Sequence, residues 1–199
     1  ESFINELDIQ TISAKRQEVL EVLIDSIQHQ INFKQAIRLN FICTHNSRRS
    51  HFAQIWAQTI ANYFNLDVAC YSCGTEATAL FPKVIETLEK TGFVFEKLSN
   101  ETNPIYAIKF DKNEQPIIGF SKEMDHAFNP SSGFIAIMTC SQAAEDCPLV
   151  FGADQRISLP FNDPKAFDDT KIQGDKYLET STIIATELHY VFSQIKREP

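Results

Sequence analysis

No stretch of apolar residues in the sequence approaches 18 in length, so it predicts no membrane-spanning helix. The first residues lack a basic region followed by an apolar stretch, so no signal peptide is expected. Basic residues are in the minority: 18 Lys and Arg stand against 26 Asp and Glu, for a formal net charge of −8. A chain this acidic favours neither nucleic acid nor a membrane as a partner. Any anion site must therefore be local, built from backbone N–H groups and one or two arginines.

Internal repeats and low-complexity tracts are also missing. Apolar residues make up 43% of the 199 positions, which is typical of one globular domain with a terminal extension. Five Cys is an odd number in a domain large enough to fold without disulfides. The simpler interpretation is a cytoplasmic protein with reduced, buried thiols, and the alternative is that some of these thiols react.

Apolar residues at helical spacing predict an N-terminal helical extension over residues 1–35, with one long helix or two short ones in residues 6–32. Beyond it, strands are expected to alternate with helices, and residues 104–120 are expected to form an inserted β-hairpin. The predicted strands are Ala36–Cys43, Val68–Cys73, Gly133–Met138 and Arg156–Pro160, and the predicted helices are 50–64, 82–91 and 175–196. This alternation predicts a three-layer, doubly wound α/β sandwich with a central parallel sheet and helices on both faces.

The segment Cys43-Thr-His-Asn-Ser-Arg-Arg-Ser50 joins the first of these strands to a helix. Ligands of parallel sheets bind beyond the carboxyl ends of the strands, where this Cys is placed. A thiolate there can act as a nucleophile if a helix N-terminus and a cation stabilise it, and Ser50 can donate a hydrogen bond to it. Successive N–H groups can surround an oxyanion, and a guanidinium can grip two of its oxygens. The predicted oxyanion-binding residues are Thr44, His45, Asn46, Ser47, Arg48 and Arg49.

The alternative interpretation of this loop is a buried Cys at the end of a strand, followed by a solvated pair of arginines. Two other features also have simpler interpretations. Cys70 and Cys73 have a zinc-like spacing, but residues three apart in a strand point to opposite faces, so no metal site is expected. His51 is expected to be exposed in the first turn of the helix.

Two further segments carry candidate catalytic residues. Cys140 and Cys147 are seven residues apart, and two helical turns span about 10 Å, more than the ~7 Å limit on the Cα separation of a disulfide. The segment, which ends at Pro148, must therefore unwind if the two residues pair; otherwise they are two buried thiols. Asp163 precedes Pro164 in a turn, a placement that a general acid requires but that is also common in turns without a function.

Taken in order, these motifs resemble the low-molecular-weight protein tyrosine phosphatase superfamily, and most closely its thioredoxin-coupled arsenate reductase branch. The Cys43–Ser50 loop is similar to the Cys-Thr-Gly-Asn-Ser-Cys-Arg-Ser loop of that branch, and Tyr71–Ala77 is similar to the Tyr-Ser-Ala-Gly stretch of the family. Cys140 and Cys147 match the redox pair of the branch, and Phe161–Pro164 matches its Asp-Pro loop. The resemblance covers residues 37–196, which makes residues 36–199 the expected catalytic domain.

The sequence also departs from the family pattern. His45 replaces a loop glycine, and Arg48 replaces a second loop cysteine. Gln54 stands where the reductases usually have a Glu that helps to bind potassium, which argues against that ion here, and no cofactor is expected. The extension at 1–35 and the hairpin at 104–120 lie outside the pattern.

The resemblance implies that Cys43 attacks arsenate while the loop amides and Arg49 stabilise the developing charge, and that Asp163 protonates the departing oxygen. Cys140 then attacks the Cys43 adduct and releases arsenite, and Cys147 takes over the disulfide for reduction by thioredoxin. The alternative is a phosphatase, in which water cleaves a phosphocysteine formed from a phosphoester. A phosphatase needs no further Cys pair, which favours the reductase. A second alternative is a non-catalytic module that binds an oxyanion.

Overall fold

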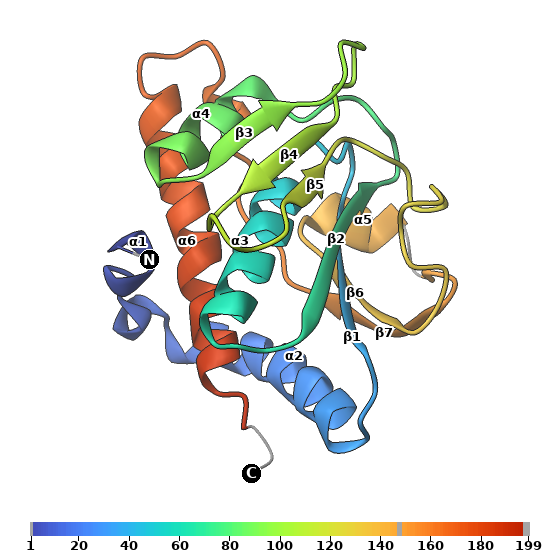
Figure 1. Cartoon of the computed structure of the whole chain (residues 1–199). Coiled ribbons are helices and arrows are strands. Elements are labelled where there is room, and N and C mark those ends of the chain that lie inside the picture. Colours follow the sequence, from blue (N-terminus) through green and yellow to red (C-terminus); the bar gives the residue numbers. More distant parts are fainter. Residues whose placement is uncertain (1, 147–148, 197–199) are drawn as a thin grey trace.

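The computed structural model describes residues 2–146 and 149–196 (Figure 1). Its central sheet consists of four parallel strands in the order β2-β1-β6-β7. The strands are β1 (Ile37–Cys43), β2 (Val68–Gly74), β6 (Phe134–Met138) and β7 (Ala153–Ser158). Helices lie on both faces of this sheet, which confirms the predicted three-layer α/β sandwich.

The two faces of the sheet are covered unequally. One face packs against the three long helices, and Leu39 and Phe41 of β1 point into this core. These helices are α2 (Ala14–Asn32), α3 (Arg49–Tyr63) and α6 (Gln173–Ser193). On the opposite face, Ile42 and Met138 pack against the short helix α5 (Ser141–Asp146) and neighbouring loops. Because both faces are buried, β1 and β6 are nearly continuous apolar runs.

The N-terminal segment is part of this packing. It contains α1 (Ser2–Asn5), a 3-10 turn (Ile9–Thr11) and α2. Ser13 caps α2 by accepting a hydrogen bond from the backbone N–H of Arg16. Leu20, Leu23 and Ile27 of α2 are fully buried in the same core as the sheet. The N-terminal helix therefore completes the core.

A second, smaller sheet contains the predicted hairpin. β4 (Tyr106–Lys109) and β5 (Ile117–Gly119) pair antiparallel, which confirms the hairpin near residues 104–120. The sequence did not predict β3 (Val94–Lys97), which pairs with the other edge of β4. It follows α4 (Pro82–Lys90), which ends before Gly92 at a φ of +104°. Ile108 points from this sheet into the main core.

The packing of α2 predicts different costs for two neighbouring truncations. Leu23→Ala removes a fully buried side chain and should lower the free energy of unfolding by about 2–5 kcal/mol. Val22→Ala changes a side chain that is 45% exposed and should cost less than about 1 kcal/mol. Urea denaturation of both variants measures the difference. Equal midpoints would mean that α2 does not share the main core.

Candidate active site

The predicted nucleophile lies where β1 meets α3. Cys43 is the last residue of β1 and is 4% exposed, and Arg49 is the first residue of α3. The five residues between them form a tight loop at the carboxyl edge of the sheet. Strand, loop and helix N-terminus thus follow in the order predicted from the sequence, with the helix dipole directed at the loop.

The loop carbonyls are bonded from outside the loop. The carbonyl of Thr44 accepts from the N–H of Glu76 at 2.9 Å, and that of Ser47 accepts from the N–H of Phe81 at 3.0 Å. His45 likewise presents its carbonyl to the hydroxyl of Ser121 at 3.0 Å. By contrast, the N–H groups of residues 44–48 donate to no residue that the structure describes. A run of unpaired N–H groups beside a helix N-terminus is suited to binding an anion.

A chain of hydrogen bonds connects the side chain of Cys43 to the loop and to Lys122. The sulfur of Cys43 lies 3.1 Å from the hydroxyl of Ser50, which in turn accepts from the side-chain amide of Asn46 at 2.8 Å. Asn46 is fully buried at a φ of +42°, in the left-handed region that Asn tolerates. Its amide oxygen accepts from the backbone N–H of Lys122 at 2.9 Å. Ser50 is therefore positioned beside the sulfur, as predicted.

Gly74 allows β2 to approach the loop closely. A Cβ atom at this position would lie 2.5 Å from the carbonyl oxygen of Thr44 and 2.7 Å from the backbone nitrogen of Asn46. Any larger residue would therefore push the loop away from the end of β2. The glycine of the Tyr71–Ala77 motif is a packing requirement of the loop.

The structure brings Arg49 and Asp163 together. The guanidinium of Arg49 donates to the carboxylate of Asp163 at 2.6 Å and to the carbonyl of Phe161 at 3.1 Å. Asp163 also accepts from the N–H of Lys165 and caps the 3-10 turn Pro164–Phe167. In this arrangement Asp163 only accepts hydrogen bonds. The guanidinium of Arg49 is thus engaged by Asp163 and Phe161 in this structure.

The side chain of Arg48 is directed elsewhere. It donates to the hydroxyl of Tyr177 and to the carboxylate of Asp168, each at 2.6 Å, and lies 3.9 Å from the centre of the Phe81 ring. Desolvation acts to raise the pKa of Asp168, but hydrogen bonds from Tyr177, Gln173 and Arg48 outweigh it and hold that pKa below its usual range. The guanidinium therefore tethers the loop to α6, and the backbone N–H is what Arg48 adds to the predicted oxyanion-binding set.

Two other predicted residues border the loop. His45 has a half-exposed ring, 46% by side chain, whose Nε2 lies 3.6 Å from the Glu76 carboxylate. Cys140 is 1% exposed, and its sulfur lies 3.7 Å from the hydroxyl of Thr44. Cys140 and Cys43 belong to one buried cluster on the α5 face of the sheet. Cys147, with Pro148, lies outside the described residues.

Gln54 uses its whole side-chain amide within the protein. Its nitrogen donates to the carbonyls of Cys70 and Ile118, at 3.2 and 3.3 Å, and its oxygen accepts from the hydroxyl of Ser72 at 2.6 Å. These bonds hold α3 against β2 and the smaller sheet.

Lys122 is a buried lysine that the sequence did not single out. It is 1% exposed, and its Nζ lies 3.4 Å from the carbonyl of Phe120 and 4.6 and 5.5 Å from the ring centres of Phe120 and Phe128. Burial lowers its pKa to about 8, and the charge of Cys73 partly offsets this effect. Lys122 is also attached to the catalytic loop, because its backbone N–H is the donor to Asn46.

The prediction that His51 is exposed is wrong, because the ring is fully buried at the start of α3. Its Nδ1 lies 3.4 Å from the hydroxyl of Ser72, and its Nε2 has no partner among the described residues. Burial and the charge of Lys122 lower the pKa of His51 to about 3, so the ring is neutral at pH 7. The position follows from α3 being enclosed near its N-terminus by both sheets.

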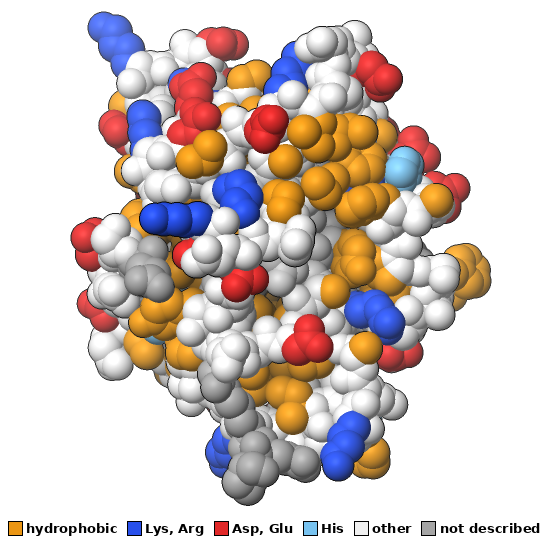
Figure 2. All heavy atoms as spheres, viewed as in Figure 1, with side chains coloured by type: hydrophobic (Ala, Val, Ile, Leu, Met, Phe, Trp, Pro, Cys, Tyr) orange, Lys and Arg blue, Asp and Glu red, His pale blue; other side chains and the backbone are white. Residues whose placement is uncertain are grey.

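The face of the molecule in Figure 2 carries no broad patch of basic side chains. Basic side chains there are interspersed with acidic ones, and apolar side chains gather toward the upper right of the view. With a net charge of −8, only short-range donors such as the loop N–H groups and Arg49 could attract an anion.

Replacing Lys122 by Met should change how stability depends on pH. The folded pKa of Lys122, about 8, lies below its ordinary value of 10.5, so the folded protein binds fewer protons between these pH values. The contribution of Lys122 to stability is therefore full above pH 10.5 and is lost as pH falls through 8, by up to about 3 kcal/mol. Lys122→Met should be at least as stable as the parent at pH 7, and the difference should shrink or reverse toward pH 10. Urea midpoints at pH 7, 8.5 and 10 measure it; parallel curves would contradict the assignment.

No family model matches the chain. It is 30% identical to arsenate reductase 2 of Staphylococcus haemolyticus over 124 residues, which cover 62% of this chain and 76% of that protein. It is 26% identical over 131 residues to the arsenate reductase of Bacillus subtilis strain 168, covering 66% and 76% of the two chains. It is 34% identical over 86 residues to that of Staphylococcus aureus strain Newman, covering 43% of this chain and 60% of that relative.

Solved structures agree on the fold. The low-molecular-weight protein tyrosine phosphatase from T. tengcongensis superposes with a TM-score of 0.55 at 13% identity, over 80% of this chain and all of that one. The sequence relatives named above are arsenate reductases, and one of them is 30% identical and covered to 76% of its length. The chain therefore has the fold of low-molecular-weight protein tyrosine phosphatases and belongs to the arsenate reductase family, a family of enzymes.

Proposed function

We propose that the protein is an arsenate reductase in which Cys43 is the nucleophile and residues 44–49 bind the oxyanion. The observation that carries the proposal is the run of unpaired N–H groups over residues 44–48, next to a thiol held 3.1 Å from the Ser50 hydroxyl. Arsenate accepts hydrogen bonds on all of its oxygens, so it can satisfy several donors at once. Arg49 would then leave Asp163 and bind two arsenate oxygens.

The first step joins the Cys43 sulfur to arsenic. One arsenate oxygen departs with a proton from Asp163, and arsenic remains As(V). Cys140 then attacks the Cys43 sulfur, so that the S–As bond breaks, its electron pair passes to arsenic, and arsenite leaves as As(III). The 3.7 Å contact between Cys140 and Thr44 supports this role, because it places the second thiol at the rim of the loop.

The disulfide must finally be reduced. We propose that Cys147 attacks Cys140 and frees Cys43, and that a dithiol protein such as thioredoxin then reduces the 140–147 disulfide. Reduction of this disulfide by a second protein needs movement of α5, because Cys140 is 1% exposed. Its sulfur also receives a hydrogen bond from the N–H of Ala143 at 3.3 Å. With six residues, α5 is short enough to unwind at a modest energetic cost.

Phosphoester hydrolysis is the second candidate, favoured by the contact between Arg49 and Asp163. Those two residues and Cys43 are all that this reaction requires. Water would cleave the phosphocysteine, and Cys140 would have no role.

Anion binding can be separated from chemistry in a Cys43→Ser background. Arg49→Lys keeps the charge but loses the two-pronged donor, so the affinity for arsenate or phosphate should fall by about 10–100-fold. Arg48→Lys is the matched control: it should lower the unfolding midpoint, because it breaks the tether to Asp168, but leave the anion affinity within about twofold. Isothermal titration calorimetry measures both. Equal losses in the two variants would contradict the assigned roles.

Three cysteine variants separate reductase from phosphatase. Cys43→Ser should abolish arsenate turnover with thioredoxin and hydrolysis of p-nitrophenyl phosphate alike. Cys140→Ser should abolish only the arsenate turnover. Cys70→Ala is the control: burial raises the pKa of that thiol and keeps it unreactive, so both activities should persist.

Three other outcomes would contradict parts of the proposed function. Arsenate turnover that survives Cys140→Ser would contradict the proposed disulfide transfer through Cys140. Hydrolysis without any arsenate turnover in the parent would identify a phosphatase, and loss of neither activity in Cys43→Ser would remove the nucleophile assigned above.

A further inference from the structure

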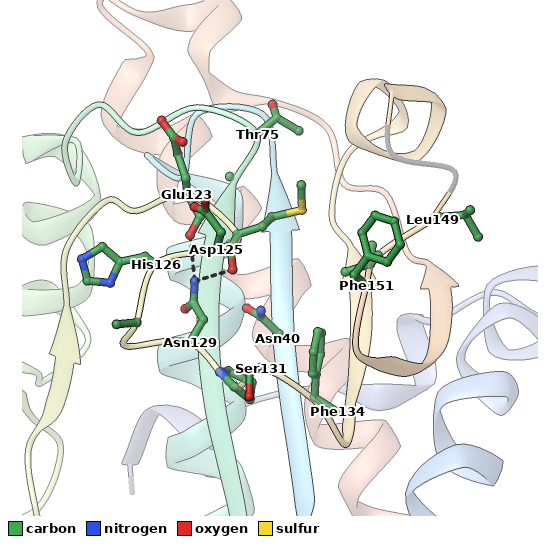
Figure 3. Close-up of a pocket in the computed structure, with 15 residues that line it drawn as sticks. Asn40, Thr75, Glu123, Asp125, His126, Asn129, Ser131, Phe134, Leu149 and Phe151 are labelled. Atoms are coloured by element: carbon green, nitrogen blue, oxygen red, sulfur yellow. Dashed lines mark hydrogen bonds between the residues drawn. The ribbon is translucent and has the colours of Figure 1, made fainter.

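A cavity of about 670 Å³ lies on the α5 face of the sheet, outside the Cys43–Arg49 loop (Figure 3). One wall is the connection between β5 and β6, and the other is the segment after α5. Asn40 of β1 and Phe134 of β6 form its floor. We call it the amide pocket. Its further lining residues are Gly74, Thr75, 123–127, 129–131 and 149–151.

Two buried amide oxygens in the amide pocket lack partners. Asn40 is 2% exposed, and its Oδ1 accepts no hydrogen bond from any described residue. Asn129 is 9% exposed, and its Oδ1 is likewise unpartnered within the described chain. The orientation of Asn129 is set by its Nδ2, which donates to the carbonyls of Glu123 and Met124 at 2.8 and 3.3 Å. Both amides point into the cavity in Figure 3.

The buried side chain of Asn40 lowers the stability of the folded protein when no ligand is bound. Asn is disfavoured inside strands, and this one lies on the sheet face that Ile42 and Met138 otherwise make apolar. A buried acceptor without a donor loses its bonds to water and gains nothing in return. An apolar residue would fit the same place at lower cost, so the amide indicates a ligand that supplies a donor.

The charge of the amide pocket differs from that of the catalytic loop. Glu123 and Asp125 are exposed at its rim, whereas its described lining contains neither Lys nor Arg. His126 is present, but its Nδ1 accepts from the N–H of Phe128. Two carboxylates, with no Lys or Arg in the described lining, disfavour an anion such as arsenate or phosphate and favour a cation.

Apart from the hydroxyls of Thr75 and Ser131, the rest of the amide pocket is apolar, and its walls are held together. Leu149 and Phe151 are 76% and 91% exposed at the mouth, which favours covering them with hydrocarbon. The two walls are tied together at Gly152, where a Cβ atom would lie 2.0 Å from the carbonyl oxygen of Ser131. The N–H of Gly133 also donates to the carbonyl of Gly152 at 3.0 Å. The cavity is within the usual size for small-molecule sites.

We propose that the amide pocket binds an organic cation: an ammonium or guanidinium group on an apolar body. Its N–H groups satisfy Asn40 and Asn129, its charge is balanced by Glu123 and Asp125, and its hydrocarbon covers Phe134 and Phe151. The site is independent of the proposed arsenate chemistry.

Three probes that share one hydrocarbon body test the proposal: 4-phenylbutylamine, 4-phenylbutanol and 4-phenylbutanoate. Titrations followed by NMR of the ¹⁵N-labelled full chain should show saturable binding of the amine, with shifts at residues 123–131 and 149–151. The alcohol should bind at least tenfold more weakly, and the carboxylate should not bind. Equal binding of all three, or no binding of the amine, would overturn the proposal.

Variants locate the contacts. Asn40→Leu should abolish amine binding while raising the thermal midpoint, and Asp125→Asn, at an exposed position, should weaken binding severalfold even if the first variant does not fold. Phe151→Ala should weaken binding, whereas Phe33→Ala, which truncates a 66% exposed Phe on the other side of the sheet, should not. Unchanged affinity in Asp125→Asn and Phe151→Ala would contradict the site. Binding of a Lys-containing apolar peptide with no binding of the amine would assign the pocket to a protein partner and overturn the proposal as stated.

Discussion

The unpaired backbone N–H groups of residues 44–48 are the constraint on which the surrounding structure depends. Backbone N–H groups that donate to no other part of a chain are free to bind a ligand. These N–H groups donate to no residue of the described chain, whereas the loop carbonyls accept bonds from the segment after β2 and from Ser121. In the proposed function, an oxyanion accepts hydrogen bonds from these donors.

Several unfavourable features lie beneath the loop and act together to hold it. Asn46 adopts a left-handed conformation so that its side chain can join Ser50 to Lys122. Gly74 has no side chain, which allows the end of β2 to contact the loop. Lys122 keeps an ammonium group inside the protein, at a cost in stability below its pKa. Costly features concentrated around one loop are what a functional site imposes on a fold.

Much of this fold follows from patterns in the sequence. The apolar runs of β1 and β6, and the amphipathic helices, have periods that local sequence encodes directly. β3 was missed because it is a short edge strand whose Val94 is 64% exposed, so it has no buried alternation to detect. For the same reason the start of β7 was predicted three residues late: Asp154 and Gln155 are exposed.

The candidate site was predictable in its order of residues but not in its side-chain geometry. Cys43, Ser50 and Arg49 lie together because strand, loop and helix are contiguous. The contact of Arg48 with Tyr177 spans 129 residues, and the burial of His51 and Lys122 depends on the smaller sheet closing over α3. Long-range packing of this kind leaves no local signal, so the sequence did not reveal where the Arg48 side chain lies and wrongly predicted that His51 is exposed.

The most direct measurement follows the backbone amides themselves. In ¹⁵N-labelled Cys43→Ser protein titrated with arsenate, the amide protons of residues 44–48 should all move downfield with one shared dissociation constant. Amides of α2, such as that of Val22, should not change. If the loop amides stay unmoved while arsenate binds elsewhere, or if they already show the shifts of hydrogen-bonded protons without the anion, the central claim is contradicted.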